Sequence, residues 1–209
     1  MIHTEHLTFQ YKKKENVFSF PNITLNQQEN LLVLGKSGIG KTTLLHLLAG
    51  LLKPTNGTVM IDHVVINKLV TKQLDKFRGE NIGLVFQKKH AIQSLNVLEN
   101  LQARLYFSKK KIENTAIETV LKQLDLNEFK HNKVNKLSEG QLQRLSIASA
   151  VIHQPKVILA DEPTSSLDDE NCKIVMKLLI EQAQKTKANL IVITHDSRIK
   201  PFFQNTITL

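Results

Sequence analysis

The distribution of apolar residues predicts strands near both ends of the chain. Continuous apolar runs of four or five residues, bounded by polar residues or glycine, are typical of strands that are buried on both faces. Such runs occur at residues 31–35, 82–87, 157–161 and 190–194. Helical segments separate these runs, so we expect an α/β fold with a mostly parallel sheet. A short final strand, TITL, closes the chain.

Near the N-terminus the apolar residues alternate with polar ones instead. Leu7, Phe9 and Tyr11 are separated by polar residues, which predicts a half-buried strand. Residues 18–25 predict another strand, at a sheet edge because Pro21 has no amide hydrogen to donate. The segments TVMI and VVIN, two residues apart, predict a hairpin. We therefore expect an N-terminal antiparallel β part.

The middle of the chain has a helical pattern. Apolar residues between 117 and 124 recur at intervals of three and four, which places them on one face of a helix. We expect an inserted, mostly helical subdomain at about 88–150. The core of this single domain would then consist of residues 1–87 and 151–209, with a further helix over 169–185.

The composition fits one globular domain. The chain has 209 residues, of which 41% are hydrophobic and 22% charged. Its apolar runs are far shorter than the roughly 20 residues that cross a bilayer, and its first residues lack the apolar stretch of a signal peptide. A single cysteine, Cys172, excludes an intrachain disulfide. We expect a cytoplasmic protein.

The net charge of +9 does not identify a partner by itself. A basic protein can bind nucleic acid or an anionic membrane surface. The lysines are scattered, however, with short runs only at 12–14 and 109–111, and solvated loops explain such runs equally well. We expect no nucleic-acid partner.

The segment GKSGIGKTT, at residues 35–43, carries the strongest chemical signal. It fits the pattern G-x-x-x-x-G-K-[ST], follows a predicted strand and opens a predicted helix. Its glycines allow backbone N–H groups to face phosphate oxygens, and the helix N-terminus adds partial positive charge. Lys41 would contact the β- and γ-phosphates, and Thr42 would ligate Mg²⁺. The expected nucleotide contacts here are Gly35, Lys36, Ser37, Gly38, Ile39, Gly40, Lys41, Thr42 and Thr43.

Two acidic residues end the predicted strand at 157–161. Asp161 lies at its carboxyl end, where open α/β sheets bind ligands, and could hold Mg²⁺ through water. Glu162 follows and could polarise an attacking water. The pair could instead cap the next turn, but the nearby phosphate-binding loop favours the catalytic interpretation.

A second, partial anion-binding turn occurs in KLSEGQLQR, at residues 136–144. Ser138, Gly140 and Gln141 offer a hydroxyl, an unobstructed backbone N–H and an amide at a predicted helix start, which suits an anion. Ser138 and Gln141 also fit a capping box, and taken alone the capping role is favoured.

Together these motifs resemble those of one family. The segments GKSGIGKTT, LVFQ, KLSEGQLQR, VILADEP, SSLDD and ITHD follow in that order, and the chain resembles the ATP-binding-cassette ATPases over nearly its whole length. The resemblance implies a P-loop NTPase (RecA-like) core. It also implies a head-to-tail dimer, in which each ATP lies between one subunit's P-loop and the other's signature turn. The partial turn would then be half of a site that a second copy completes.

The resemblance assigns roles to further residues. Gln87 matches the glutamine that contacts Mg²⁺ and the attacking water, Asp168 the aspartate that contacts the partner's P-loop, and His195 the histidine at the γ-phosphate. Tyr11 matches the aromatic residue that stacks on adenine. Ordinary structural roles are the alternatives for Gln87 and His195, and core packing is the alternative for Tyr11.

The implied site has three groups of residues. The catalytic residues are Glu162, His195 and Gln87. The metal-binding residues are Thr42, Gln87 and Asp161. Outside the P-loop, the nucleotide contacts are Tyr11, Ser138, Gly140, Gln141 and Asp168.

Three positions depart from the family's usual pattern. Glu139 stands where the family usually has glycine, and its carboxylate would lie near the partner's γ-phosphate. Ser149 occupies a position that is often arginine. Lys36 adds a positive charge to the P-loop, next to the triphosphate.

The resemblance implies an ATP-hydrolysing subunit of an ABC transporter. It would pair with a second copy and drive integral membrane permease subunits, and so be peripheral on the inner face of the cell membrane. Such partners dock a short helix near Gln87, in a groove that residues 88–107 would line. Burial of their apolar side chains inside the helical subdomain is the alternative. The stretch from RGENIGLVFQ to SLNVLENL resembles the lipoprotein-release and macrolide-efflux branch. The alternative is a regulatory or mechanical ABC ATPase of the cell-division type, which drives a membrane partner without translocating a substrate.

Overall fold

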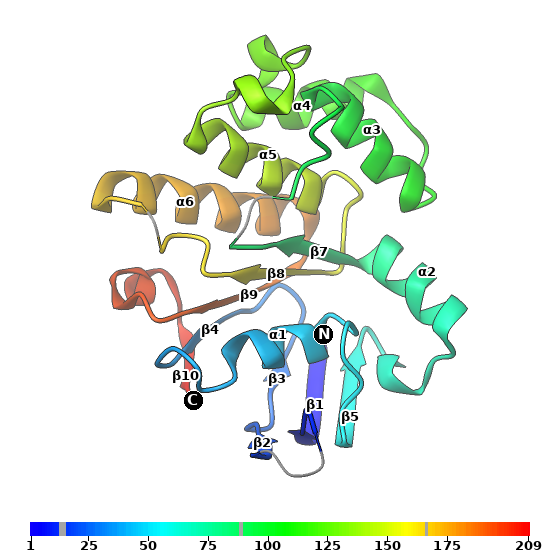
Figure 1. Cartoon of the computed structure of the whole chain (residues 1–209), viewed down its shortest axis with the longest axis vertical. Coiled ribbons are helices and arrows are strands. Elements are labelled where there is room, and N and C mark those ends of the chain that lie inside the picture. The colour runs from blue at the N-terminus through cyan, green and yellow to red at the C-terminus, as the bar shows by residue number, and fades with distance from the viewer. Residues whose placement is uncertain (13–15, 88–89, 166) are drawn as a thin grey trace.

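The parallel strands predicted from the apolar runs form one sheet of the computed structural model, which describes residues 1–12, 16–87, 90–165 and 167–209 (Figure 1). The strand order is β10-β4-β9-β8-β7. These strands are β4 (Asn30–Leu34), β7 (Ile82–Val85), β8 (Val157–Asp161), β9 (Asn189–Thr194) and β10 (Asn205–Thr208). Every residue of β8 and β9 is buried, as expected for strands covered on both faces.

The strand predicted to end at Gln87 is shorter in the structure. Strand β7 ends at Val85, where its pairing with β8 stops at Ala160. Gln87 therefore lies two residues beyond the strand and not at its end.

The N-terminal strands form an antiparallel sheet, as predicted. It contains β1 (Ile2–Phe9), β2 (Phe18–Ser19), β3 (Thr24–Leu25), β5 (Asn56–Ile61) and β6 (Val64–Val65). The single strand expected at 18–25 is wrong: β2 and β3 flank Pro21 and each pairs separately with β1. The β5–β6 hairpin is confirmed, and both of its turn residues, Asp62 and His63, have positive φ.

The helices lie on both faces of the parallel sheet. They are α1 (Lys41–Leu48), α2 (Thr71–Asn81), α3 (Val97–Phe107), α4 (Asn114–Gln123), α5 (Glu139–Val151) and α6 (Asp169–Thr186). Short 3₁₀ turns occur at Ile66–Lys68, Asn127–Phe129, Val134–Lys136 and Ser197–Phe202. In Figure 1, α1 lies between the two sheets, α5 and α6 cover the other face, and α3 and α4 lie beyond α5. No helix in the described ranges is both long and apolar enough to cross a membrane.

Two apolar clusters sandwich the parallel sheet. On β4, Leu32 belongs to the cluster beneath α5 and α6, whereas Leu31 and Val33 belong to the cluster around α1. The same alternation along β8 and β9 explains why their sequences are continuously apolar. Helices α3, α4 and α5 share the first cluster with the sheet. The division of the domain at about 88–150 stays a prediction.

Several predicted features fall outside the described residues. These are the lysines at 13–14, the first two residues of the segment expected to line the groove, at 88–89, and Ser166 of the SSLDD motif.

Candidate active site

The predicted phosphate-binding loop connects β4 with α1 at the carboxyl ends of the parallel strands. Gly38 and Gly40 have φ angles of 82° and 107°, which residues with a side chain rarely adopt. A Cβ at Gly40 would also lie only 2.7 Å from the Phe18 ring. The loop therefore needs glycine at both positions, and its path leads into the N-terminus of α1.

A pocket of about 270 Å³ opens on this loop. Its lining combines distant parts of the sequence: β2, the loop and start of α1, and the segments that follow β7, β8 and β9. The lining residues are Phe18, Ser37, Gly38, Gly40, Lys41, Thr42, Thr43, Gln87, Glu162 and His195. The structure thus brings the three predicted catalytic residues together with the P-loop.

Lys41 lines this pocket and is held in place by backbone carbonyl groups. Its ammonium donates hydrogen bonds to the carbonyl oxygens of Gly35, at 2.8 Å, and Lys36, at 3.0 Å. It also lies 3.6 Å from Glu162 Oε1. Only 7% of the lysine is exposed, so water screens its positive charge only weakly. Gly35 and Lys36 act here through their backbone.

Asp161 lies beside Thr42 and has an unsatisfied oxygen. The Thr42 hydroxyl donates to Asp161 Oδ2 at 3.0 Å. The other oxygen, Oδ1, is buried and has no hydrogen-bond partner among the described residues. Burial raises the pKa of this carboxyl group above its usual value. An orphaned carboxylate oxygen beside a hydroxyl is a donor set that a hard cation such as Mg²⁺ prefers, so these residues fit that ion.

Glu162 is positioned by the end of β9. Its carboxylate accepts a hydrogen bond from Thr194 Oγ1 at 2.6 Å and lies 2.9 Å from His195 Nδ1. Its backbone has a φ of 48°, and its N–H donates to Ile193 O at 2.8 Å. Sequence reasoning missed Thr194, although its place immediately before His195 in the ITHD motif was a usable signal.

Tyr11 lies beside the pocket. Its hydroxyl is 2.9 Å from Thr43 Oγ1, and its ring contacts Phe9 and Phe18 edge to face. The residue is 53% exposed, which argues against the core-packing alternative. Stacking on adenine stays a prediction. Phe18, which lines the pocket and packs against the loop, was not predicted.

The signature turn forms the N-terminus of α5, outside the pocket's lining. Ser138 and Gln141 form the expected capping box, with Gln141 N donating to Ser138 Oγ at 3.3 Å and Ser138 N donating to Gln141 Oε1 at 2.8 Å. A Cβ at Gly140 would meet no atom within 4 Å, so this backbone is open to approach. Asp168 caps α6 by accepting from Asn171 N at 2.8 Å and is also outside the lining.

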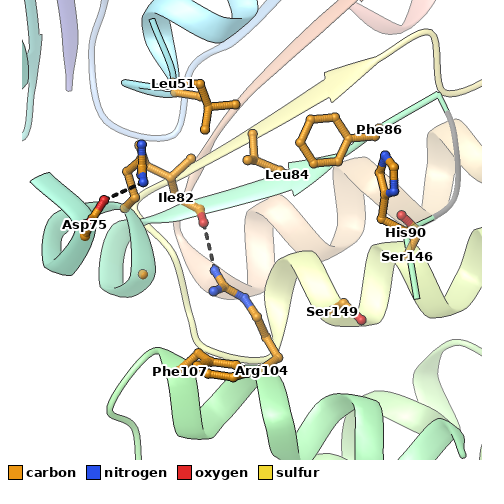
Figure 2. A pocket seen from close by; sticks show the side chains of 13 residues that line it. Leu51, Asp75, Ile82, Leu84, Phe86, His90, Arg104, Phe107, Ser146 and Ser149 are labelled. Carbon is orange, nitrogen blue, oxygen red and sulfur yellow. Dashed lines mark hydrogen bonds and ion pairs between the residues drawn. The ribbon is translucent and has the colours of Figure 1, made fainter. Parts of the chain in front are cut away.

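A second hollow, of about 400 Å³, lies between α2, β7, α3 and α5 (Figure 2). We call this hollow the groove. Residues of β7 and the following segment form one wall, and Arg104 and Phe107 of α3 face it. Its lining is Ala49, Leu51, Asp75, Arg78, Gly79, Ile82, Leu84, Phe86, His90, Arg104, Phe107, Ser146 and Ser149. The lining includes three residues of the segment predicted to form it, at 88–107.

Arg104 ties α3 to the sheet at one end of this groove. Its guanidinium donates to Ile82 O at 2.9 Å and lies 2.7 Å from His153 Nε2. Burial lowers the pKa of Arg104 and, together with the arginine's charge, lowers the pKa of His153 to about 3. His153 is therefore neutral at physiological pH.

The sequence and the fold match known proteins. The family described as ABC transporter matches residues 19–165. The lipoprotein-releasing system ATP-binding protein LolD of Buchnera aphidicola subsp. Schizaphis graminum is 36% identical over 192 residues, which cover 90% of this chain and 84% of LolD. An uncharacterised ABC transporter ATP-binding protein of Methanocaldococcus jannaschii, MJ0796, is 37% identical over 219 residues, covering 100% and 93% of the two chains.

A solved structure agrees with these sequence matches. The dimeric structure of a post-hydrolysis state of the ATP-binding cassette MJ0796, bound to ADP and Pi, matches with a TM-score of 0.88 and 33% identity. It covers 100% of this chain and 94% of that one. The predicted family and fold class are confirmed. The chain belongs to the ABC transporter family, as an ATPase domain of that family.

Proposed function

We propose that this chain is the ATP-hydrolysing subunit of an ABC transporter of the export or lipoprotein-release type. Two copies would close head to tail on ATP, and the dimer would drive separate integral membrane permease subunits at the inner face of the membrane. The observation that carries the proposal is the pocket in which the P-loop, Glu162 and His195 meet. The dimeric MJ0796 cassette and the lipoprotein-releasing relative support the assembly.

The P-loop would bind the phosphates of ATP. Backbone N–H groups of the loop and the N-terminus of α1 would face phosphate oxygens. The Lys41 ammonium now donates to two neutral carbonyl oxygens, and a charged phosphate oxygen is the stronger acceptor. Tyr11, beside Thr43, would stack on adenine.

Thr42, Asp161 and Gln87 would hold Mg²⁺. Burial disfavours the charged form of Asp161, and its Oδ1 has no partner among the described residues, so a bound cation would relieve both costs. When bound, Mg²⁺ would offset negative charge on the transferring phosphoryl group.

Glu162 would position the attacking water and accept its proton. Hydrogen bonds from Thr194 and His195 fix the carboxylate, which limits the reorganisation needed for reaction. As the water oxygen bonds to the γ-phosphorus, the bond to the β–γ bridging oxygen breaks and ADP leaves with that electron pair. His195, which lines the same pocket, would contact the γ-phosphate.

The second half of each site would come from the other copy. Ser138, Gly140 and Gln141 lie outside the pocket of their own chain, at a helix N-terminus whose glycine is open to approach. That position suits an anion supplied by a second subunit. Asp168, at the start of α6, would contact the partner's P-loop.

The groove would receive a short segment of the permease. Its walls combine apolar side chains with Arg78, Arg104 and Asp75, and it lies between α3 and the sheet. A segment seated there would contact both parts, so it could transmit a change in their arrangement. The regulatory alternative is not favoured, because the relatives described above have transporter and lipoprotein-releasing names.

Replacing Glu162 with glutamine tests the function. Glu162→Gln removes the general base but keeps the volume and hydrogen-bonding capacity of the side chain. We expect ATP turnover to fall at least about a hundredfold while ATP and Mg²⁺ still drive dimerisation. Phosphate release and size-exclusion chromatography measure the two effects.

The matched control is Glu181→Gln, an exposed residue of α6 that lies outside the pocket lining. It should leave both turnover and dimerisation unchanged. Parental turnover in Glu162→Gln would refute the role of Glu162. Turnover by a chain that cannot dimerise would refute the shared site.

A further inference from the structure

The end of α3 exposes two neighbouring aromatic rings. Tyr106 is 70% exposed and Phe107 is 69% exposed, and their rings touch edge to face with centroids 5.6 Å apart. Ile112, shortly after the helix, is 46% exposed. Single exposed apolar residues are normal, but a cluster of large ones marks an interaction surface.

Three consecutive lysines follow these rings, and the turn that carries them has a fixed backbone. Residues 109–111 are all exposed. Lys109 N donates to Tyr106 O at 3.1 Å, and Lys110 N donates to Leu105 O at 3.0 Å. The buried Ser108 hydroxyl also donates to Leu105 O. The lysines are therefore held close to the two rings.

The charge of this turn is mostly uncompensated. Lys111 lies 3.0 Å from Glu113, but both side chains are well exposed, so the pair is screened by water. No ion pair of Lys109 or Lys110 occurs within the described ranges. Lysines at a helix C-terminus complement the helix dipole, which accounts for their charge but not for the exposed rings beside them.

Aromatic rings next to lysines suit the interface of an anionic bilayer. Tyrosine and phenylalanine rings insert at the headgroup level, and lysine ammonium groups bind the phosphates while their chains lie along the apolar boundary. Each lysine near an anionic leaflet strengthens binding roughly fivefold. We propose that Tyr106, Phe107 and Lys109–Lys111, the α3-end patch, contact anionic lipid headgroups directly.

The location of the patch agrees with this proposal. Phe107 belongs both to the patch and to the groove, where Figure 2 shows it beside Arg104. If the groove receives the permease, the patch lies on the side of the subunit that faces the membrane. Only this biological use rests on the proposed function, since lipid binding itself requires neither ATP nor a permease.

The test is sedimentation of the whole chain with sucrose-loaded vesicles, without nucleotide. Vesicles of phosphatidylcholine alone are compared with vesicles that contain about 30% phosphatidylglycerol, at about 0.1 M salt. We expect binding to the anionic vesicles only. Raising the salt to about 1 M should release the chain, because the Debye length then falls to about 3 Å.

A triple variant, Lys109→Gln, Lys110→Gln and Lys111→Gln, isolates the lysines. We expect its partition coefficient for the anionic vesicles to fall about 25-fold, the effect of removing two lysines. Lys111 is not counted, because Glu113 partly neutralises its charge. Tyr106→Ser should weaken binding severalfold. The matched control changes three exposed lysines of α6 instead, Lys173→Gln, Lys177→Gln and Lys185→Gln, and should bind within about twofold of the parent.

Several outcomes would overturn the proposal. They are equal binding to neutral and anionic vesicles, equal losses in the two triple variants, and unchanged binding of Tyr106→Ser. An oligonucleotide that binds more tightly than the vesicles and depends on Lys109–Lys111 would assign the patch to nucleic acid instead. ATP turnover of each variant reports whether it is folded. If neither the parent nor any variant hydrolysed ATP, the proposed function would be refuted, but the result of the vesicle experiment would still stand.

Discussion

Asp161 and Glu162 are neighbours in the chain, yet their carboxylates contact different side chains. Strand β8 ends at Asp161, whose side chain meets Thr42, and the left-handed backbone of Glu162 turns the next side chain toward Thr194 and His195. A non-glycine residue with φ near 48° is uncommon and persists only where surrounding contacts stabilise it. Two adjacent acids can therefore take separate roles, one in binding a metal ion and one in activating water.

The buried His153 should make the protein less stable in acid. Its pKa falls from 6.5 to about 3 on folding, so the unfolded chain binds more protons between these values. The free energy of unfolding should therefore decrease as the pH falls below 6.5, by about 2 kcal/mol from this residue at pH 5. His153→Gln, which keeps an acceptor for Arg104, should flatten this dependence in urea unfolding experiments.

His131 provides the control, because it is a histidine on the exposed surface. His131→Gln should leave the pH dependence unchanged. If His153→Gln unfolds with the same slope against pH as the parent, then His153 is not buried in its neutral form.

At the scale of elements, the contact between β7 and α5 depends on one glycine. A Cβ at Gly83 would overlap the carbonyl oxygen of Ala150 and lie 3.2 Å from Pro155. Gly83→Ala should therefore force β7 away from α5, with a loss of about 3 kcal/mol in the free energy of unfolding. Denaturant titration of the purified variant measures this loss.

Gly140→Ala is the matched control for stability, because its Cβ would meet no atom within 4 Å. It should be as stable as the parent, or slightly more stable, since alanine favours helix. A stable Gly83→Ala variant would show that β7 and α5 can separate without cost.

The elements that sequence predicted well are those with a single strong pattern. Val157–Asp161 was predicted residue for residue, because a strand buried on both faces is apolar throughout and ends where the charges begin. Helix α2 was missed, because its residues are mostly polar, it includes Gly79, and none of them is fully buried. The strand expected at 18–25 failed because two short segments pair with different parts of β1.

The site was predictable as a set of residues but not as a set of contacts. Motif spacing identified Lys41, Asp161 and Glu162, which the fold brings to one edge of the sheet. The bond between Thr194 and Glu162 spans 32 positions of sequence and depends on β8 and β9 being neighbours. Such partners follow from strand order, which local patterns do not determine.

At the scale of the whole molecule, Glu139 should oppose pairing of two copies. It lies in the first turn of α5, within the signature turn that would face the partner's ATP. Glu139→Gly should tighten the ATP-bound dimer about tenfold, because a carboxylate near the γ-phosphate repels it. Analytical ultracentrifugation in the Glu162→Gln background measures the dimer without turnover.

Glu139→Gln separates charge from size in this experiment. It should tighten the dimer nearly as much as glycine does if repulsion is the cause. A dimer that is unchanged or weaker in Glu139→Gly would contradict this explanation.

One buried bond has a consequence for how two such sites would operate. Gln143, on α5, donates to the carbonyl oxygen of Pro163, immediately after Glu162. The helix whose start would serve a neighbour's nucleotide is thus anchored to the loop that carries its own water-activating acid. In a closed dimer, a movement of α5 at one nucleotide would therefore be transmitted to Glu162 at the other nucleotide. Hydrolysis at the two sites would then be coupled, because the rate at each site would depend on the state of the other.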